Sequence, residues 1–449
     1  MMSNRTLLLK GGQLVDPEAN EVYFADVEIA DGKIRSIHEP GSLKVADEMI
    51  DVAGLYIAPG FVDSHIHDAA LPFGGEVQRA LLKQGVTTAI AGHCGDGPCL
   101  SAAAHQEGEK PWIKVGYMVG HNSLREEVGC SDRYAPATPE QIERMIPLLA
   151  QELAAGAMGL SFGLEYAPGS SAEEINAVAA RVAQSKDRVI SIHIRDDGIY
   201  CAPAVAEAIK IAQDHGVSVQ ISHLGSMTAF GVSQSCVAMI EDARRAGVSV
   251  FFDCYPYTAF CTSSATAVFD DGFETRWGGK GCSCLQAASG KFKGERLTKE
   301  SLAWMRENEP EGLIIAHVMN EEEVLFCLKH ADGIVASDSL YRKGGAHPRL
   351  SGTFPRALRL LTAAGLSWPE AVKKMTILPS QVFKLDSGRI AAGVAADLVI
   401  FDPKTLKDCA TFEDPLAAPE GIHFVFIDGQ MVLKEGEILT EPAGAMLYR

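Results

Sequence analysis

Several side chains of the kind that bind metal ions stand at the ends of apolar segments of this sequence. They are His65 and His67, His93 with Cys94, His193, His223 and Asp338. Imidazole, thiolate and carboxylate groups together form a ligand set suited to zinc. Because His65 and His67 are two positions apart, both would point to the same side of a strand. These residue types predict a zinc site assembled from distant parts of the chain.

Asp338 is the carboxylate of this set and could also take part in catalysis. Zinc lowers the pKa of a bound water toward neutrality, and a neighbouring carboxylate could take the proton and pass it to a leaving group. An aspartate within Ser337-Asp338-Ser339 could also be a helix cap or a turn residue. Its place opposite the histidines favours catalysis, so we interpret Asp338 as the general base of a hydrolase.

Other residues of the same types are weaker candidates. Cys282 and Cys284, with Cys254 and Cys261, lack the paired Cys-x-x-Cys spacing of a zinc site and are predicted to be free thiols. The chain has 11 cysteines and no secretory signal, which favours reduced thiols over a disulfide framework. His121 could be a ligand or a hydrogen-bond partner of one, and both interpretations stay open.

The elements that must position these residues are near-continuous apolar segments separated by helical stretches. We identify eight such segments, at 61–66, 87–92, 115–119, 159–164, 189–193, 217–223, 248–255 and 333–338. This alternation is typical of parallel β/α units whose strands are covered on both faces. We predict an α/β fold, a TIM-like (β/α)8 barrel, in which active-site residues follow the strands.

The two ends of the chain have a different pattern, with short alternating apolar runs and turn signals such as Asp31-Gly32 and Asp428-Gly429. We predict that residues 1–58 and 388–449 together form a small β-sandwich domain. The barrel domain would then cover residues 59–387. A stretch rich in glycine, serine and cysteine, at about 261–318, is predicted to be an insertion before the eighth strand, with its own short strand at 313–316.

Composition excludes several classes of protein. The chain has 449 residues, 47% of them hydrophobic and 22% charged, which is typical of a globular protein. The net charge is −18 without any basic run, so a nucleic-acid partner is not expected. No apolar run is long enough for a membrane span or a signal peptide, so we predict a cytoplasmic protein with a small-molecule substrate. A monomer and a homo-oligomer are both compatible with this composition.

The motifs resemble those of a known family. They include Pro59-Gly60-Phe61-Val62-Asp63-Ser64-His65-Ile66-His67, Cys94-Gly95, Tyr255-Pro256-Tyr257 and His347-Pro348-Arg349. Over nearly its whole length the sequence resembles the amidohydrolase superfamily, and within it the N-acyl-D-amino-acid deacylases, or D-aminoacylases. The resemblance implies a zinc-dependent hydrolase that cleaves the amide bond of N-acyl-D-amino acids to a carboxylate and a free D-amino acid.

The resemblance also implies roles for individual residues. The tighter zinc would be held by Cys94, His193 and His223, and a second, weaker position would be framed by His65, His67 and Asp338. In this family the cysteine takes the place of a carbamylated lysine on strand four. The predicted strand four has no lysine here, and Lys114 lies at the wrong end of the barrel. Arg349 and either Tyr255 or Tyr257 would bind the substrate carboxylate, and Tyr166 would line the pocket.

The sequence departs from the family pattern where Gly225 replaces a frequent substrate-binding lysine and where Ser339 replaces the usual glycine. Glu165 occupies a variable pocket position, where its negative charge would repel acidic substrates. We therefore expect neutral or basic substrates rather than acyl-D-glutamate or acyl-D-aspartate. Alternatives on the same metal frame are a cyclic amide or imide hydrolase and a dipeptidase. An inactive scaffold is disfavoured because every expected ligand is present.

Overall fold

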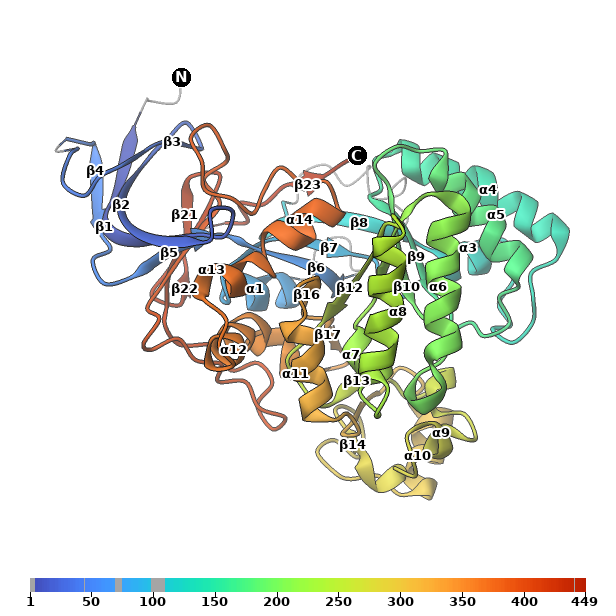
Figure 1. Cartoon of the computed structure of the whole chain (residues 1–449). Helices are drawn as coiled ribbons and strands as arrows, with labels where there is room; N and C mark the ends of the chain where they lie inside the picture. Colours follow the sequence, from blue (N-terminus) through green and yellow to red (C-terminus); the bar gives the residue numbers. More distant parts are fainter. Residues whose placement is uncertain (1–4, 44, 69–74, 98–109, 440) are drawn as a thin grey trace.

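A parallel barrel forms the larger part of the molecule (Figure 1). The computed structural model describes residues 5–43, 45–68, 75–97, 110–439 and 441–449. The barrel strands are β6 (Phe61–His67), β7 (Val86–Ala91), β8 (Lys114–Gly120), β9 (Gly159–Gly163), β10 (Val189–His193), β11 (Ser218–Ile221), β12 (Val250–Cys254) and β16 (Gly333–Val335). Their consecutive parallel pairing confirms the predicted TIM-like α/β fold.

The eighth strand differs from the prediction of one strand over residues 333–338. It ends early as β16, which pairs with β12, and the chain resumes as β17 (Ser339–Arg342), which pairs with β6. Between them Asp338 has a positive φ of 52°, and its backbone N–H donates to the carbonyl oxygen of His65 at 2.9 Å. This single segment therefore changes partner at Asp338 and connects the two edges of the sheet.

Helices cover the outside of the barrel (Figure 1). They are α1 (Glu76–Leu82), α3 (His121–Glu127), α4 (Pro139–Ala154), α5 (Ala172–Ala183), α6 (Ala202–His215), α7 (Leu224–Thr228), α8 (Ser233–Arg245), α11 (Glu321–Lys329), α12 (Arg349–Ala363), α13 (Trp368–Lys373) and α14 (Ile377–Val382). Local signals start several of them; Thr138, for example, forms a capping box with Gln141 at α4. Across the described ranges, none of the helices combines the length and apolar character needed to cross a bilayer.

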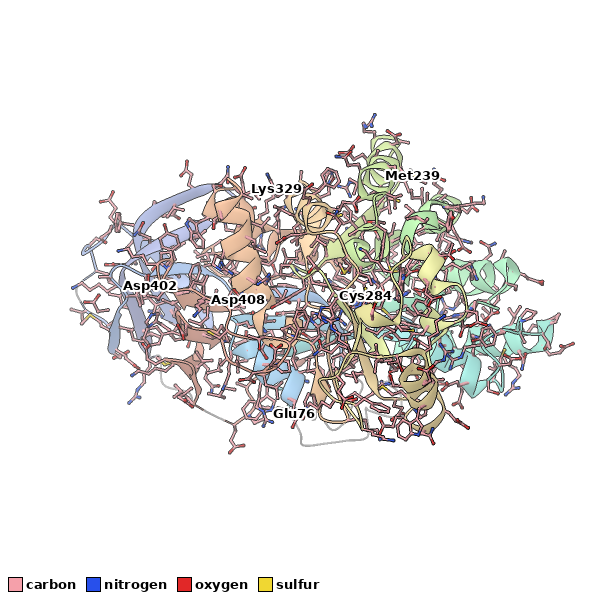
Figure 2. The ribbon with its side chains drawn as sticks, turned by 90° about the horizontal axis from the view of Figure 1, so that it is seen from below. Glu76, Met239, Cys284, Lys329, Asp402 and Asp408 are labelled. Carbon is pink, nitrogen blue, oxygen red and sulfur yellow. The ribbon has the colours of Figure 1, made fainter. Side chains whose placement is uncertain are left out.

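The predicted insertion contains a small antiparallel sheet of β13 (Phe260–Ser263), β15 (Leu313–Ala316) and β14 (Leu285–Ala287), in that order. The expected strand at 313–316 is confirmed. The insertion also contains two α-helices, α9 (Phe273–Arg276) and α10 (Lys299–Asn308). Figure 2 views the molecule from the side of the insertion, on which Cys284 is labelled.

Strands from both ends of the chain form a second sheet, at the left of Figure 1. They are β1 (Thr6–Asp16), β2 (Glu21–Ala30), β3 (Lys33–His38), β4 (Glu48–Asp51), β5 (Tyr56–Pro59), β19 (Leu398–Phe401), β20 (Ile422–Ile427), β21 (Gln430–Lys434) and β22 (Glu437–Ile438). The two termini meet where β5 pairs with β19. The final strand, β23 (Met446–Leu447), pairs instead with β8 of the barrel. The domain boundaries given above stay a prediction.

Lys114 lies where the barrel meets this second sheet. At the start of β8, its Nζ atom is 2.8 Å from Asp397 and 2.7 Å from Asp428. The side chain therefore holds the two sheets together at the end of the barrel opposite the strand C-termini, as its position in the sequence indicated.

Candidate metal centre and active site

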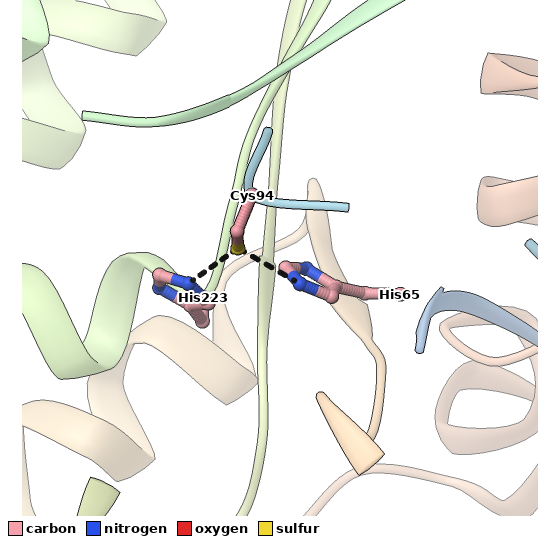
Figure 3. Close-up of side chains that lie close together, drawn as sticks. All are labelled: His65, Cys94 and His223. Carbon is pink, nitrogen blue, oxygen red and sulfur yellow. Dashed lines mark hydrogen bonds between the residues drawn. The ribbon is translucent and has the colours of Figure 1, made fainter. Parts of the chain in front are cut away.

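The thiol of Cys94 lies between two imidazoles at the C-terminal ends of the strands (Figure 3). Its Sγ atom is 3.5 Å from Nε2 of His65 and 3.4 Å from Nε2 of His223. The three donor atoms lie within 4.8 Å of one another, and all three residues are buried. A cysteine and two histidines at this spacing are a donor set that fits zinc.

Each of these imidazoles has one ring nitrogen engaged by an acceptor that holds it in place. Nδ1 of His65 donates to Oδ2 of Asp253 at 3.3 Å, and Nδ1 of His223 donates to Oγ of Ser226 at 3.0 Å. The Ser226 hydroxyl also donates to the His223 carbonyl oxygen at 2.9 Å, which leaves its oxygen able to accept from Nδ1. Because Nδ1 of each ring is engaged in this way, Nε2 is the nitrogen that faces Cys94 and is available to a metal.

The imidazole of His193 lies beside that of His223. Its Nε2 atom is 2.9 Å from Oε2 of Glu165, and its ring centroid lies 4.7 Å from that of His223. Since an ionised carboxylate only accepts hydrogen bonds, Nε2 carries the proton and Nδ1 is the nitrogen available to a metal.

A second group of donors adjoins the first and shares His65. Its members are His65, His67 and Asp338. Nε2 of His67 donates to Oδ1 of Asp338 at 2.9 Å, and Nε2 of His65 lies 3.5 Å from the same oxygen. The other oxygen of Asp338 is 2.8 Å from Nη1 of Arg349, whose side chain is buried. The residues predicted to frame two metal positions thus lie side by side.

Electrostatics favours the charged forms at this site. Burial alone would raise the pKa of Cys94, but the neighbouring imidazoles of His65 and His223 bring it well below the usual value for a thiol. Burial would likewise raise the pKa of Asp338, but the Arg349 guanidinium and the imidazoles lower it. A thiolate and a carboxylate are the protonation states that a divalent cation needs from its ligands.

Backbone conformation marks the same residues. Cys94, His223 and Asp338 have φ values of 54°, 35° and 52°, in the left-handed region that side chains other than glycine seldom occupy. Such conformations persist only where the surroundings fix them, and they cluster at functional sites.

A cavity of about 420 Å³ opens beside this cluster. Among the residues that line it are His67, Cys94, Tyr166, Asp338 and Arg349. The hydroxyl of Tyr166 accepts a hydrogen bond from Thr262 at 3.3 Å, and its ring lies 4.4 Å from that of His193. This places Tyr166 and Arg349 together at the wall of the cavity.

The two tyrosines of Tyr255-Pro256-Tyr257 are placed differently. Tyr255 is buried with its ring 4.8 Å from the guanidinium of Arg349. Tyr257 donates its hydroxyl proton to the carbonyl oxygen of Pro348 at 3.2 Å, at the start of α12. Tyr255 therefore supports Arg349 directly, whereas Tyr257 holds the segment that carries it.

Sequence reasoning missed the residues that support the ligands. Asp253 is fully buried and accepts hydrogen bonds from the His65 ring, from the His223 backbone N–H at 2.8 Å and from Nε2 of Gln220 at 2.6 Å. The carboxylate of Asp63 accepts bonds from the backbone of His65 and from Ser337. The sequence signal that could have identified Asp253 and Asp63 is an aspartate inside an otherwise apolar strand.

The weaker candidates lie outside the two donor groups. His121 is 2.9 Å from Glu174, which also pairs with Arg125, so it belongs to a separate buried ion cluster. The ring of His93 stacks on that of His65, with centroids 4.2 Å apart. The cysteines at 254, 261, 282 and 284 form no disulfide and belong to neither donor group.

These features can be compared with known proteins. A model described as the amidohydrolase family matches residues 56–432. The chain belongs to the amidohydrolase family, and so to a superfamily of hydrolases that act on carbon–nitrogen bonds. The N-acyl-D-glutamate deacylase of Alcaligenes xylosoxydans xylosoxydans is 33% identical, over 100% of this chain and 98% of that protein.

Two solved structures are similar over the full length. One is a structure of D-aminoacylase, a protein with a binuclear metal centre. It is 30% identical to this chain, with a TM-score of 0.86, over 99% of both chains. The other is N-acyl-D-glutamate deacylase from Bordetella bronchiseptica, complexed with zinc and a phosphonate inhibitor; it is 28% identical with a TM-score of 0.86, over 100% of both chains. The resemblance noted in the sequence is confirmed.

Proposed function

We propose that this protein is a zinc-dependent hydrolase that cleaves the amide bond of N-acyl-D-amino acids. The observation that carries the proposal is the thiol of Cys94 between the Nε2 atoms of His65 and His223, beside the carboxylate of Asp338. The relatives support the substrate class, because N-acyl-D-glutamate deacylase and D-aminoacylase are similar to this chain along its whole length.

The donor groups support one tightly held zinc and a second, weaker position. Cys94 and His223, which lie in one donor group with His65, would hold the first ion together with His193, and His65, His67 and Asp338 would hold the second. The known structures of relatives support this arrangement, since one contains zinc and another has a binuclear metal centre. Zinc in this site would supply Lewis-acid activation of water and of the amide carbonyl.

Asp338 would move the proton during hydrolysis. The proximity of Arg349, at 2.8 Å, keeps its carboxylate ionised, so Asp338 can accept the proton of the attacking water. Collapse of the tetrahedral adduct breaks the carbon–nitrogen bond, and Asp338 returns the proton to the departing amine. The products are a carboxylate and a free D-amino acid.

Arg349 and Tyr166 would orient the substrate from the cavity wall. A guanidinium suits an α-carboxylate, because it can donate two parallel hydrogen bonds. The structure changes one expectation about the side chain of the substrate. Glu165 does not present a free charge, since its two oxygens bond to His193 at 2.9 Å and to Arg276 at 3.2 Å. Glu165 therefore gives no reason to expect that acidic substrates are repelled from the pocket.

A substrate panel tests the proposal. It should contain N-acetyl-D-amino acids with neutral, basic and acidic side chains, their L-enantiomers and small cyclic amides. We expect zinc-dependent release of the free D-amino acid from the acyclic D-compounds. Turnover confined to cyclic amides would instead indicate an imidase-type activity. A zinc-loaded protein inactive on the whole panel would contradict the proposal.

A further inference from the structure

One side chain of the insertion, that of Arg276 at the end of α9, forms ion pairs with two acidic residues near the metal centre. Its Nη2 atom is 3.2 Å from Oε1 of Glu165, and its Nε atom is 2.9 Å from Oδ1 of Asp197. Glu165 and Asp197 follow barrel strands β9 and β10 and are both buried. The guanidinium therefore joins the insertion to two loops at the rim of the barrel.

Glu165 connects this contact to a candidate zinc ligand. While Oε1 accepts from Arg276, Oε2 accepts from Nε2 of His193 at 2.9 Å. The Glu165 carboxylate is thus bonded on one side to the insertion and on the other to the imidazole. A change in its position would rotate the His193 ring, because the bond to Nε2 fixes where Nδ1 points.

The junction between α9 and the barrel is tight. Gly198 has a φ of 76°, and a Cβ atom at this position would lie 2.2 Å from the carbonyl oxygen of Arg276. Next to it, the indole N–H of Trp277 donates to Oδ2 of Asp197 at 2.7 Å, and Trp277 is buried. Backbone contact and side-chain bonds together determine where the guanidinium of Arg276 lies.

We propose that Arg276 is a positioning residue for the metal centre, acting through Glu165 to orient the imidazole of His193. The inference rests on the proposed function, since it takes His193 as a zinc ligand. It goes further in making the insertion part of the metal centre. Supporting residues of this kind typically change metal affinity by about 10- to 100-fold when they are removed.

The first test compares zinc affinity, by competition with a chelator, for the wild type and Arg276→Ala. We expect zinc to bind about 10- to 100-fold more weakly to the variant. Arg276→Lys, which keeps the charge, should recover part of the affinity. The matched control is Arg306→Ala, because Arg306 also forms an ion pair within the insertion, at 2.6 Å from Asp270, but does not contact Glu165. Its zinc affinity should equal that of the wild type.

A second variant moves the insertion without removing any charge. Gly198→Ala forces the Arg276 backbone away from the barrel, so we expect weaker zinc binding in this variant too. With Co²⁺ in place of zinc, the visible absorption spectrum should change in Arg276→Ala and Gly198→Ala but not in Arg306→Ala. If Arg276→Ala does not fold, the zinc affinity and Co²⁺ spectra of Arg276→Lys and Gly198→Ala are compared with those of the wild type instead.

The outcomes separate this inference from the proposed function. A wild-type protein that binds no zinc would overturn the proposed function itself. Unchanged zinc affinity in His193→Ala would overturn the assignment of His193 as a ligand. Wild-type zinc affinity and Co²⁺ spectra in both Arg276→Ala and Gly198→Ala, with His193→Ala impaired, would overturn the positioning role of Arg276 alone.

Discussion

Replacing Arg349 by methionine would separate two roles that its position allows. The side chain is 2% exposed; Nη1 lies 2.8 Å from Asp338, and Nη2 donates to the carbonyl oxygen of Cys261 at 3.2 Å. It can act as the counter-ion of Asp338, as the anchor for a substrate carboxylate, or as both. Methionine keeps much of the apolar volume that packs on Tyr255 while removing the charge.

The expected magnitudes differ between stability and catalysis. Removing one partner of a buried ion pair costs about 3 to 5 kcal/mol, because the remaining charge is left uncompensated. If Arg349 also holds the substrate, kcat/KM should fall by a further factor of roughly 30 to 1,000, or about 2 to 4 kcal/mol, with a clear rise in KM. Zinc should stay bound, since Arg349 is not among the donors.

A double-mutant cycle with Asp338→Asn assigns these effects. In the Asp338→Asn background the stability cost of Arg349→Met should shrink, since the amide leaves no charge to compensate. The rise in KM should persist in that background. Arg342→Met is the control, because Arg342 is partly exposed and lies 3.6 Å from Asp96 at the same cavity. An unchanged KM toward every substrate of the panel would refute the anchoring role.

The remaining predictions concern the metal, the general base and a distant ion cluster. Cys94→Ser should lose the tightly held zinc on dialysis, and stoichiometric zinc by elemental analysis would refute its role as a ligand. Asp338→Asn should lower kcat by about 10² to 10⁴ with zinc retained, whereas near-normal turnover would place the proton acceptor elsewhere. Although burial raises it, the pKa of Glu174 is lowered to about 2 by His121 and Arg125. Stability from its ionised form is therefore complete above the unfolded pKa of about 4.5 and is lost as the pH falls toward 2. Glu174→Gln should cost about 3 kcal/mol at pH 7 in denaturant unfolding, and this difference should shrink below pH 4.5; a difference independent of pH would contradict the assignment.

The sequence predicted the barrel and its candidate ligands because both depend on local patterns. Apolar segments marked the strands, and residue type at the end of each segment marked His65, Cys94, His223 and Asp338. Hydrogen bonds between side chains on distant segments could not be predicted from local sequence patterns. The bond from Asp253 to His65 joins β12 to β6, and the bond from Arg276 to Glu165 depends on how the insertion packs. The division of the eighth strand was missed because it follows from the conformation of Asp338.

The change of partner at Asp338 has a consequence for the order of assembly. The last barrel segment pairs with β12 and then with β6. The first barrel strand, β6, therefore gains its second neighbour only when a segment about 270 residues later in the chain has been made. Such distant pairings form slowly, because long loops must close before they are stabilised. During synthesis, the imidazoles and the thiol of the cluster emerge well before the carboxylate that completes it. Filling of the second metal position, which includes Asp338, would therefore report that the whole barrel has closed, and metal bound there would favour finished chains over partly folded ones.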